Sequence, residues 1–355
     1  MSDIAPARTD MADGGTRVLC DFWYARELPH LLIAFEVYAL ERIGEPARWL
    51  LAFVPSRVLL LLWLGRDFDA VAPNWYRGGR MACVLQAVAG RKSKLILLEC
   101  IDYGIQGKGA AFRFIHRILA KAVIGPAMRR SVGALQTLTD WEHREFIRHY
   151  GLSDRIVHTI KWPLAGWVAP PHHRESAERY VFASGRTACD WETIFKAAEI
   201  GGWKLKIVCA AADRERVERL NGNVGAEILS EISLAHHDDM LAQATVYALC
   251  LQEQYKSSGQ VRLAACISAG VPVVASAVNG LDGYLIDGVT AAIVRPGDAA
   301  QLAAKVEALV AEPALCAEQA RRAQGYAACY TKADYFASLE RFTRNAVSPT
   351  ASSPQ

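Results

Sequence analysis

The architecture of the chain is indicated by Glu253-Gln-Tyr-Lys-Ser-Ser-Gly-Gln260 and, a little further on, by Ser268-Ala-Gly-Val-Pro-Val-Val-Ala-Ser276. The apolar residues 245–251 predict a strand, and the polar run after them predicts a loop. Residues 260–269 then predict a helix, and residues 272–276 predict a second strand. This order of elements is typical of a parallel sheet covered by helices on both faces.

A loop that leads from a strand into a helix lies at the carboxyl edge of such a sheet. Free backbone N–H groups and the helix dipole favour an anion there. Ser257, Ser258 and Gly259 allow a ligand to approach the backbone closely, and Lys256 adds a positive charge. These residues predict a cradle for a diphosphate. The alternative is that they only cap the helix, as small residues before a helix commonly do.

The same alternation of short strands and helices extends over the rest of the chain. It predicts two doubly wound, Rossmann-like α/β domains with a ligand cleft between them. In the second half we expect strands at 180–183 and 204–209, and helices at 191–200 and after Asp298. In the first half we expect strands at 17–22, 68–73, 94–99 and 133–138, and helices at 32–43, 79–88 and 141–150.

Prolines and small polar residues over 163–178 predict a linker between the domains. The full division that we expect is a loose tail at 1–16, an N-terminal domain at 17–162, the linker at 163–178, a C-terminal domain at 179–330, a last helix at 331–346 and a second loose tail at 347–355.

The composition is typical of a cytoplasmic globular protein. With 355 residues and 52% hydrophobic residues, the chain is long enough for two domains with a core each. Its nine cysteines are scattered and form no Cys-x-x-Cys pair, which predicts reduced core residues and excludes a zinc or disulfide framework. The first sixteen residues lack the apolar segment of a signal peptide.

Positive charge and tryptophan are concentrated in residues 1–170, which hold 22 Lys and Arg against 16 Asp and Glu, and seven of the nine Trp. This half is a candidate for facing an anionic surface or ligand, although ordinary variation between domains is the alternative. Residues 49–63 are strongly apolar, but Pro55 and Arg57 interrupt them and they are too short to span a bilayer. They predict either a buried helix or an interfacial helix.

The second half resembles a known family. Its motifs are Ser257-Ser-Gly-Gln260, Ala269-Gly-Val-Pro-Val-Val-Ala-Ser276, Gly280-Leu-Asp-Gly-Tyr-Leu-Ile-Asp-Gly288, Ile293-Val-Arg-Pro-Gly-Asp298, and Phe182-Ala-Ser-Gly-Arg186 continued by Asp190-Trp191. Together they resemble the C-terminal domain of family-4-like retaining glycosyltransferases of the GT-B fold. The resemblance covers residues 180–345 well and the first half only in its order of elements. The helix at 331–346 is similar to the one that crosses back to the N-terminal domain in that fold.

Two features depart from the family pattern. The family usually carries Glu-x7-Glu across the helix after the loop, but Ser257 and Ala265 stand at these positions. Glu253 is a substitute candidate near the donor sugar, whereas ribose recognition needs another group. The glycine-rich turn usual after the first strand is replaced by Asp21-Phe-Trp-Tyr-Ala-Arg26.

The resemblance implies transfer of a glycosyl group from a nucleoside diphosphate sugar to an acceptor hydroxyl with retention, without a metal or other cofactor. Fixed positive charge would stabilise the departing diphosphate. The candidate catalytic residues are Arg186, Lys256, Glu253 and Asp102. The candidates for binding the donor diphosphate are Gly185, Arg186, Lys256, Ser257, Ser258, Gly259 and Gln260. On the acceptor side, Asn74, Trp75, Asp102 and Tyr103 are candidates because they directly follow predicted strands.

Other motifs are weaker signals. Asp67-Phe-Asp69 has the Asp-x-Asp form of a metal motif but lies at the start of a strand, opposite the expected cleft. Adjacent residues of His236-His-Asp-Asp239 point about 100° apart on a helix, so we expect solvated histidines and not a metal site. Gly78-Gly-Arg80 lacks the spacing of a nicotinamide site, and the arginines lack the aromatic spacing of a nucleic-acid platform.

The sequence therefore predicts a cytoplasmic, hexosyltransferase-type enzyme, peripheral on the inner face of the cell membrane through its basic N-terminal domain. Its partners would be a nucleotide sugar, an acceptor glycan, glycolipid or small molecule, and an anionic membrane surface, with no nucleic acid. The acceptor would be a lipid-linked polysaccharide precursor or a natural product. Two alternatives remain open: a catalytically degenerate GT-B binding or scaffold protein, and a GT-B sugar-nucleotide epimerase.

Overall fold

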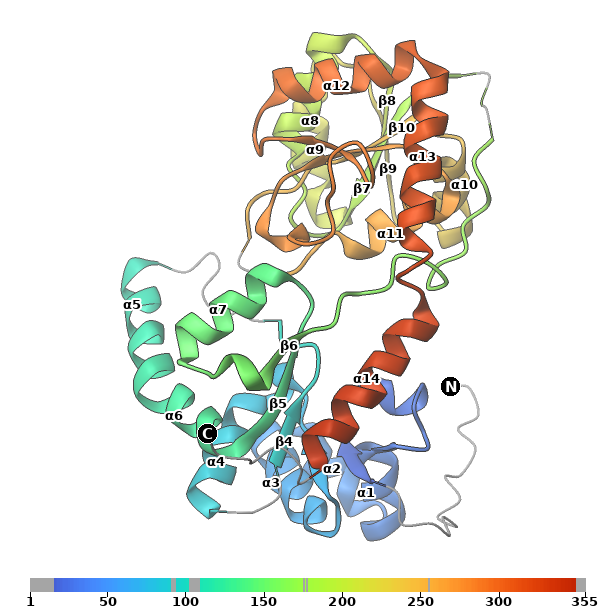
Figure 1. Ribbon diagram of the computed structural model, residues 1–355. Coiled ribbons are helices and arrows are strands. Elements are labelled where there is room, and N and C mark those ends of the chain that lie inside the picture. The colour runs from blue at the N-terminus through green and yellow to red at the C-terminus, as the bar shows by residue number, and fades with distance from the viewer. Residues whose placement is uncertain are drawn as a thin grey trace. The chain divides into compact units, whose positions relative to one another are not determined.

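The computed structural model describes residues 16–90, 94–101, 109–174, 176, 178–254 and 256–348. The chain divides into two compact units (Figure 1). Unit 1 comprises Met1–Leu138, His143–Ile160 and Phe336–Gln355, and unit 2 comprises Thr139–Glu142 and Lys161–Tyr335. Each unit holds a six-stranded sheet whose strand pairs are all parallel, which confirms the predicted α/β fold class. The predicted tails lie almost wholly outside the described residues.

Unit 1 is built on a sheet with the strand order β2-β1-β3-β4-β5-β6. Its strands are β1 Val18–Cys20, β2 Leu32–Ala34, β3 Ala70–Ala72, β4 Lys94–Leu97, β5 Val132–Thr137 and β6 Val157–Thr159. Its helices are α1 Phe35–Ile43, α2 Pro46–Ala52, α3 Val54–Leu64, α4 Arg80–Ala89, α5 Ala110–Leu119, α6 Gly125–Ser131 and most of α7 Asp140–Tyr150. The order reverses between β1 and β3, as in doubly wound sheets.

Two parts of unit 1 differ from the prediction. Residues 32–43 are not one helix, because Leu32–Ala34 first form the edge strand β2 and the helix begins at Phe35. Residues 49–63 belong to two helices, since the chain is extended at Phe53 and Pro55 stands in the first turn of α3. Proline has no backbone N–H and so cannot continue a preceding helix. α3 buries one face, including Arg57, while its Leu59 and Trp63 are exposed, as is Trp49 on α2.

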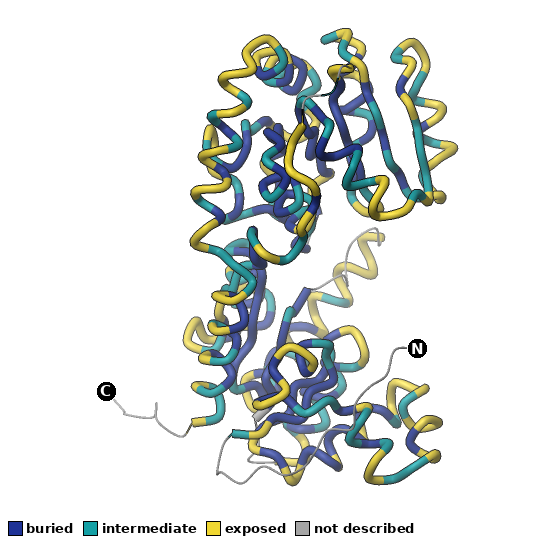
Figure 2. The backbone as a smooth tube through the Cα atoms, turned by 90° about the vertical axis from the view of Figure 1, so that its right-hand side faces the viewer, coloured by how far each residue is buried: buried dark blue, intermediate teal, exposed yellow. Residues whose placement is uncertain are grey.

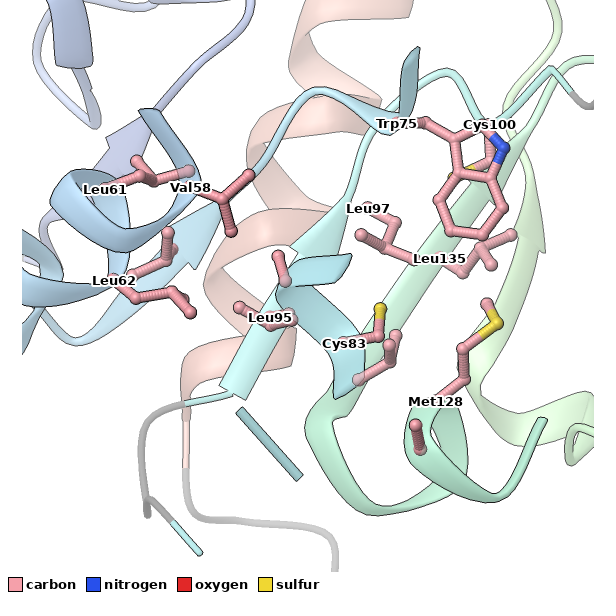
Figure 3. Packing of buried hydrophobic residues seen from close by; sticks show 14 of the residues in the cluster. Val58, Leu61, Leu62, Trp75, Cys83, Leu95, Leu97, Cys100, Met128 and Leu135 are labelled. Atoms are coloured by element: carbon pink, nitrogen blue, oxygen red, sulfur yellow. The ribbon is translucent and has the colours of Figure 1, made fainter. Parts of the chain in front are cut away.

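The core of unit 1 lies between the sheet and these helices (Figure 3). Leu95, Leu97 and Leu135 project from β4 and β5, and Val58 of α3 and Met128 of α6 pack with them. The strands β1 and β3 are fully buried and β5 almost so, the edge strands β2 and β6 are only partly buried, and the helices carry most of the exposed surface (Figure 2).

Unit 2 has the strand order β12-β11-β10-β7-β8-β9. Its strands are β7 Val181–Gly185, β8 Leu205–Cys209, β9 Glu227–Ser230, β10 Val246–Leu249, β11 Val273–Ser276 and β12 Ala292–Val294. Its helices are α8 Trp191–Gly201, α9 Arg214–Leu220, α10 Leu234–Ala242, α11 Gln260–Ala269, α12 Ala299–Ala311 and α13 Pro313–Ala327. Numbered within the unit, this is the 3-2-1-4-5-6 order of dinucleotide-binding sheets, with the switch point between β7 and β10.

Local sequence explains where several helices begin and end. The Asp298 side chain accepts a hydrogen bond from the Gln301 N–H (2.9 Å) and caps α12 as predicted. Gly151 follows α7 with a φ of +65°, a backbone conformation that favours glycine and ends the helix. α11 begins after Gly259, whose φ of +94° favours glycine.

The segment between β6 and β7 contains no helix or strand among its described residues. Leu164 is buried within it, and its N–H donates to the Tyr330 carbonyl at 2.9 Å. The last helix, α14, spans Lys332–Val347, and from Phe336 onward it belongs to unit 1. There the Phe336 ring packs against Trp23 and Tyr24.

Seven of the nine cysteines are buried, as expected for core residues, whereas Cys316 is half-buried and Cys329 is exposed. Burial raises the pKa of Cys83 and of Cys250 to about 12, so these thiols stay protonated core residues. Within the part of the chain that the structure describes, no group of three His, Cys, Asp or Glu could hold a metal ion. No described helix is both long and apolar enough to cross a membrane.

Candidate functional site

The candidate site lies in unit 2, at the carboxyl ends of β7 and β10, because doubly wound sheets bind ligands at their switch point. The loops that follow these two strands are joined by backbone hydrogen bonds. The Asp190 N–H donates to the Cys250 carbonyl (3.1 Å), and the Gln252 N–H donates to the Ala188 carbonyl (2.8 Å). The fold therefore brings together the two segments that carry the predicted donor-binding residues.

Gly185, at the end of β7, stands where a side chain has no room. A Cβ atom there would lie 2.2 Å from Nη1 of Arg262 and 2.4 Å from Sγ of Cys189. Arg262 lies on α11, and its guanidinium donates to the carbonyls of Ser184 (2.6 Å) and Thr187 (3.4 Å). Arg186 is exposed on the same loop. The sequence did not single out Arg262, because its partners lie more than seventy residues earlier in the chain.

Ser184 connects β7 to a second cluster of polar side chains. Its hydroxyl lies 2.8 Å from Nε2 of His237 and 2.9 Å from the Tyr247 hydroxyl, and Nδ1 of His237 lies 3.2 Å from Asp238. His237 is half-buried and contacts Ser184 at the end of β7, so it is not the fully solvated histidine that the sequence predicts. His236, in contrast, is exposed.

The loop after β10 places Lys256 in a largely buried position, with only 8% of the residue exposed. Removal from water disfavours an ammonium group, and this burial lowers the pKa of Lys256. A bound anion would offset that cost. A buried lysine beside the switch point is therefore suited to an anionic ligand.

The same loop holds buried polar atoms that have no partner among the described residues. They are Oε1 of Gln254 and the hydroxyl oxygens of Ser257 and Ser258. Gln254 and Ser257 are each 7% exposed. A buried polar group without a hydrogen bond is costly, so three of them in one loop point to a polar ligand.

The backbone of this loop is already engaged. The Ser257 N–H donates to Oε1 of Glu142 at 2.7 Å, and the Ser258 N–H donates to the Gly280 carbonyl at 3.2 Å. Glu142 belongs to the part of α7 that is assigned to unit 2. These two N–H groups are therefore not available to a diphosphate in this arrangement, which leaves the seryl hydroxyls and the first turn of α11, after Gly259.

Glu253 and Gln260 hold the loop against the segment 279–281. Oε1 of Glu253 accepts the Asn279 N–H at 3.0 Å, and Nε2 of Gln260 donates to the Gly280 carbonyl at 2.5 Å. Glu253 is exposed and Gln260 is buried. Both side chains therefore shape the loop, and the Glu253 carboxylate remains accessible beside it.

Gly280 packs so closely on this loop that alanine should disrupt it. A Cβ atom at Gly280 would lie 2.8 Å from the Lys256 carbonyl oxygen and 3.1 Å from the Ser258 nitrogen. We expect Gly280→Ala to lower the free energy of unfolding by about 1–3 kcal/mol. Urea unfolding checks this, with Gly325→Ala in α13 as the control. Open space surrounds Gly325, so the control should gain about 0.5–1 kcal/mol, and equal effects of the two changes would contradict the steric argument.

The predicted acceptor residues lie in unit 1 or outside the described residues. Oδ1 of Asn74 accepts the N–H groups of Tyr76 (3.0 Å) and Arg77 (3.1 Å), so this side chain caps a turn. Trp75 is buried in the core of unit 1, so its ring is not on the surface that an acceptor would contact. Asp102 and Tyr103 lie outside the described residues.

Comparisons with known proteins agree with this arrangement. Residues 190–312 match the family model of glycosyl transferases group 1. No curated protein sequence matches the chain.

Solved structures match over most of the chain at low sequence identity. Sucrose-phosphate synthase from Thermosynechococcus elongatus is 17% identical, with a TM-score of 0.65 over 82% of this chain and 77% of that one. HepE from Anabaena in complex with UDP is 14% identical, with a TM-score of 0.63 over 81% of each chain. A glycosyltransferase from Rickettsia africae is 11% identical, with a TM-score of 0.62 over 95% of this chain and 92% of that one.

The resemblance expected from the sequence motifs is thereby confirmed. The chain has the GT-B fold of glycosyltransferases, and residues 190–312 of its unit 2 match the family model of glycosyl transferases group 1.

Proposed function

We propose that the protein transfers a sugar from a nucleoside diphosphate sugar to an acceptor hydroxyl, with retention at the anomeric carbon, as a family-4-like enzyme. The observation that carries the proposal is the loop after β10, which holds the buried Lys256 and three buried side-chain oxygens, of Gln254, Ser257 and Ser258, that have no hydrogen-bond partner among the described residues. The group 1 family match and the solved structures of HepE with UDP and with UDP-glucose support a nucleotide-sugar donor.

The reaction breaks the bond between the anomeric carbon and the diphosphate and forms one to the acceptor oxygen. Negative charge grows on the diphosphate, so fixed positive charge lowers the barrier most. Arg186, Lys256 and the first turn of α11 would supply this charge without a metal ion, and Arg262 supports the β7 loop beneath them. The acceptor proton would pass to the departing phosphate, so no strong general base is required. The exposed Glu253 carboxylate is the candidate group near the sugar.

For the acceptor we propose a lipid-linked polysaccharide precursor, which the protein would bind at the inner face of the cell membrane. The excess of Lys and Arg in the first 170 residues and the exposed Trp49 and Trp63 support this choice. A soluble natural product is the alternative acceptor.

Thermal shift with UDP-, GDP- and dTDP-sugars and with the free diphosphates tests donor binding. We expect at least one ligand to raise the Tm, and Arg186→Ala to weaken its binding about tenfold, because a charged hydrogen bond of about 1.5 kcal/mol is lost. Arg214→Ala, an exposed arginine on α9, is the matched control. No shift with any ligand would refute the transferase, and unchanged affinity of Arg186→Ala would refute the role of Arg186.

A second candidate function is donor binding without transfer. Ser257 and Ala265 stand where the family's carboxylates would be, which favours it. A thermal shift accompanied by neither transfer nor hydrolysis of the sugar nucleotide would select this function.

A further inference from the structure

Helix α5 of unit 1 exposes an unusual amount of apolar surface. None of its ten residues, all of them described, is buried. Five large apolar side chains on it are between 45% and 62% exposed: Phe112, Phe114, Ile115, Ile118 and Leu119. Val123, in the π-helical turn Ala120–Ile124 that follows, is 44% exposed. Figure 2 shows the helix exposed along its length.

The helix keeps its charged and apolar residues on separate faces. At 100° per residue, Ile115, Ile118 and Leu119 fall on one face, whereas Arg113 and Arg117 share another. A narrow strip between the faces attaches α5 to unit 1. This strip consists of His116, whose ring stacks on His149 at 5.6 Å, and the buried Ala120. The apolar face therefore points away from the core.

The charge of the sequence around α5 has one sign. Between Asp102 and Asp140 the sequence has no acidic residue and six basic ones: Lys108, Arg113, Arg117, Lys121, Arg129 and Arg130. The exposed apolar residues around Trp49 and Phe53 lack such an excess of positive charge. Their neighbours Glu45 and Arg48 form an ion pair (3.2 Å), so the two charges cancel. Of these two exposed apolar surfaces, α5 is the one that also carries an excess of positive charge.

We propose that α5 and the turn after it, residues 110–124, form the surface that docks on an anionic lipid bilayer. Fifteen residues of helix extend about 22 Å, which is too short to span a bilayer. A helix with this division of faces lies in the plane of the interface. Its apolar face enters the acyl boundary and its basic residues contact anionic headgroups. The inference rests on the proposed lipid-linked acceptor, because α5 would bring the protein to the membrane that contains such an acceptor.

Vesicle flotation with the full chain tests this surface. The protein should float with phosphatidylglycerol-containing vesicles at low salt, and float poorly with pure phosphatidylcholine or at 1 M salt. We expect Arg113→Gln and Arg117→Gln each to weaken binding about fivefold, which is the loss of about 1 kcal/mol per charge. Ile115→Ser and Ile118→Ser should each weaken it about tenfold or more.

Matched controls lie in unit 2. Ile200→Ser replaces an apolar residue that is 60% exposed on α8, and Arg219→Gln removes an exposed charge on α9, so both should float like the wild type. Because the substituted α5 residues are exposed, all variants should keep the wild-type Tm.

Three results would overturn the proposal. One is wild-type protein that stays unbound at low salt, and another is α5 variants that float like the wild type. The third is sedimentation showing a dimer that Ile118→Ser dissociates, which would assign the face to a second copy of the chain. The donor thermal shift is measured separately, so vesicle binding without any donor shift would refute the proposed transferase and leave the docking surface standing.

Discussion

Lys256→Met is expected to lower kcat/KM by about 10²–10³-fold without lowering the free energy of unfolding. The loss follows because a preorganised positive charge at the departing diphosphate disappears. Stability should not fall, because the cost of burying the ammonium group, which lowers its pKa, disappears together with the contacts of the charge, and methionine is close to lysine in size. Steady-state kinetics and urea unfolding of the same preparation check both parts. Lys196→Met, on the exposed side of α8, should change neither quantity.

A purely structural lysine would behave in the opposite way, losing stability while kcat/KM stays close to that of the wild type. The pH dependence gives a second readout. Because the pKa of Lys256 is lowered, its ammonium loses a proton at a lower pH than an exposed lysine does, and donor affinity should fall as the pH rises through that lowered pKa. Lys256→Arg keeps its charge over the same range, so its affinity should stay flat there.

Arg57→Met should lower the free energy of unfolding by about 3–5 kcal/mol. Arg57 is buried on α3, and its Nε donates to Asp21 at 2.9 Å while Nη2 donates to Glu36 at 2.6 Å. Removing the arginine leaves the buried Asp21 carboxylate without its ionic partner. Urea unfolding measures the loss. Arg48→Met, which breaks only the exposed pair with Glu45, should cost no more than about 0.5 kcal/mol.

Two further measurements separate a stranded carboxylate from lost packing. Burial raises the pKa of Asp21 even with Arg57 opposing the shift, and without Arg57 the pKa should rise further. When a carboxyl group has a raised pKa in the native state, its protonation stabilises that state as the pH falls through the pKa. The loss of unfolding free energy in Arg57→Met should therefore become smaller toward acidic pH. Asp21→Asn in the Arg57→Met background should recover part of the loss. A pH-independent defect that Asp21→Asn does not relieve would point to packing alone.

The buried pair also explains a departure from the family pattern. The turn after β1 carries Asp21 where glycine-rich sequences are usual, and the structure shows this aspartate bound to Arg57. The sequence showed the substitution but not its partner, Arg57, which lies 36 residues later and interrupts the apolar run at 49–63.

The bounds of the elements next to the Lys256 loop were predicted closely. The predicted helix at 260–269 has the bounds of α11, and the predicted strand at 272–276 differs from β11 by one residue. All four edge strands, β2, β6, β9 and β12, of three or four residues each, were missed. So few residues do not distinguish a strand from a helix by periodicity, and pairing with a neighbouring strand of the sheet is what makes them strands.

What the sequence alone determined is the α/β class, the family resemblance and the loop that carries Lys256, because these depend on neighbours in the chain. Only the tertiary structure decided which side chains meet that loop. Arg262 donates to the Ser184 carbonyl, His237 contacts the hydroxyl of the same serine, and Glu142 accepts the Ser257 N–H. These contacts join residues 53 to 115 positions apart, and their formation depends on the packing of whole strands and helices, which local propensity does not encode.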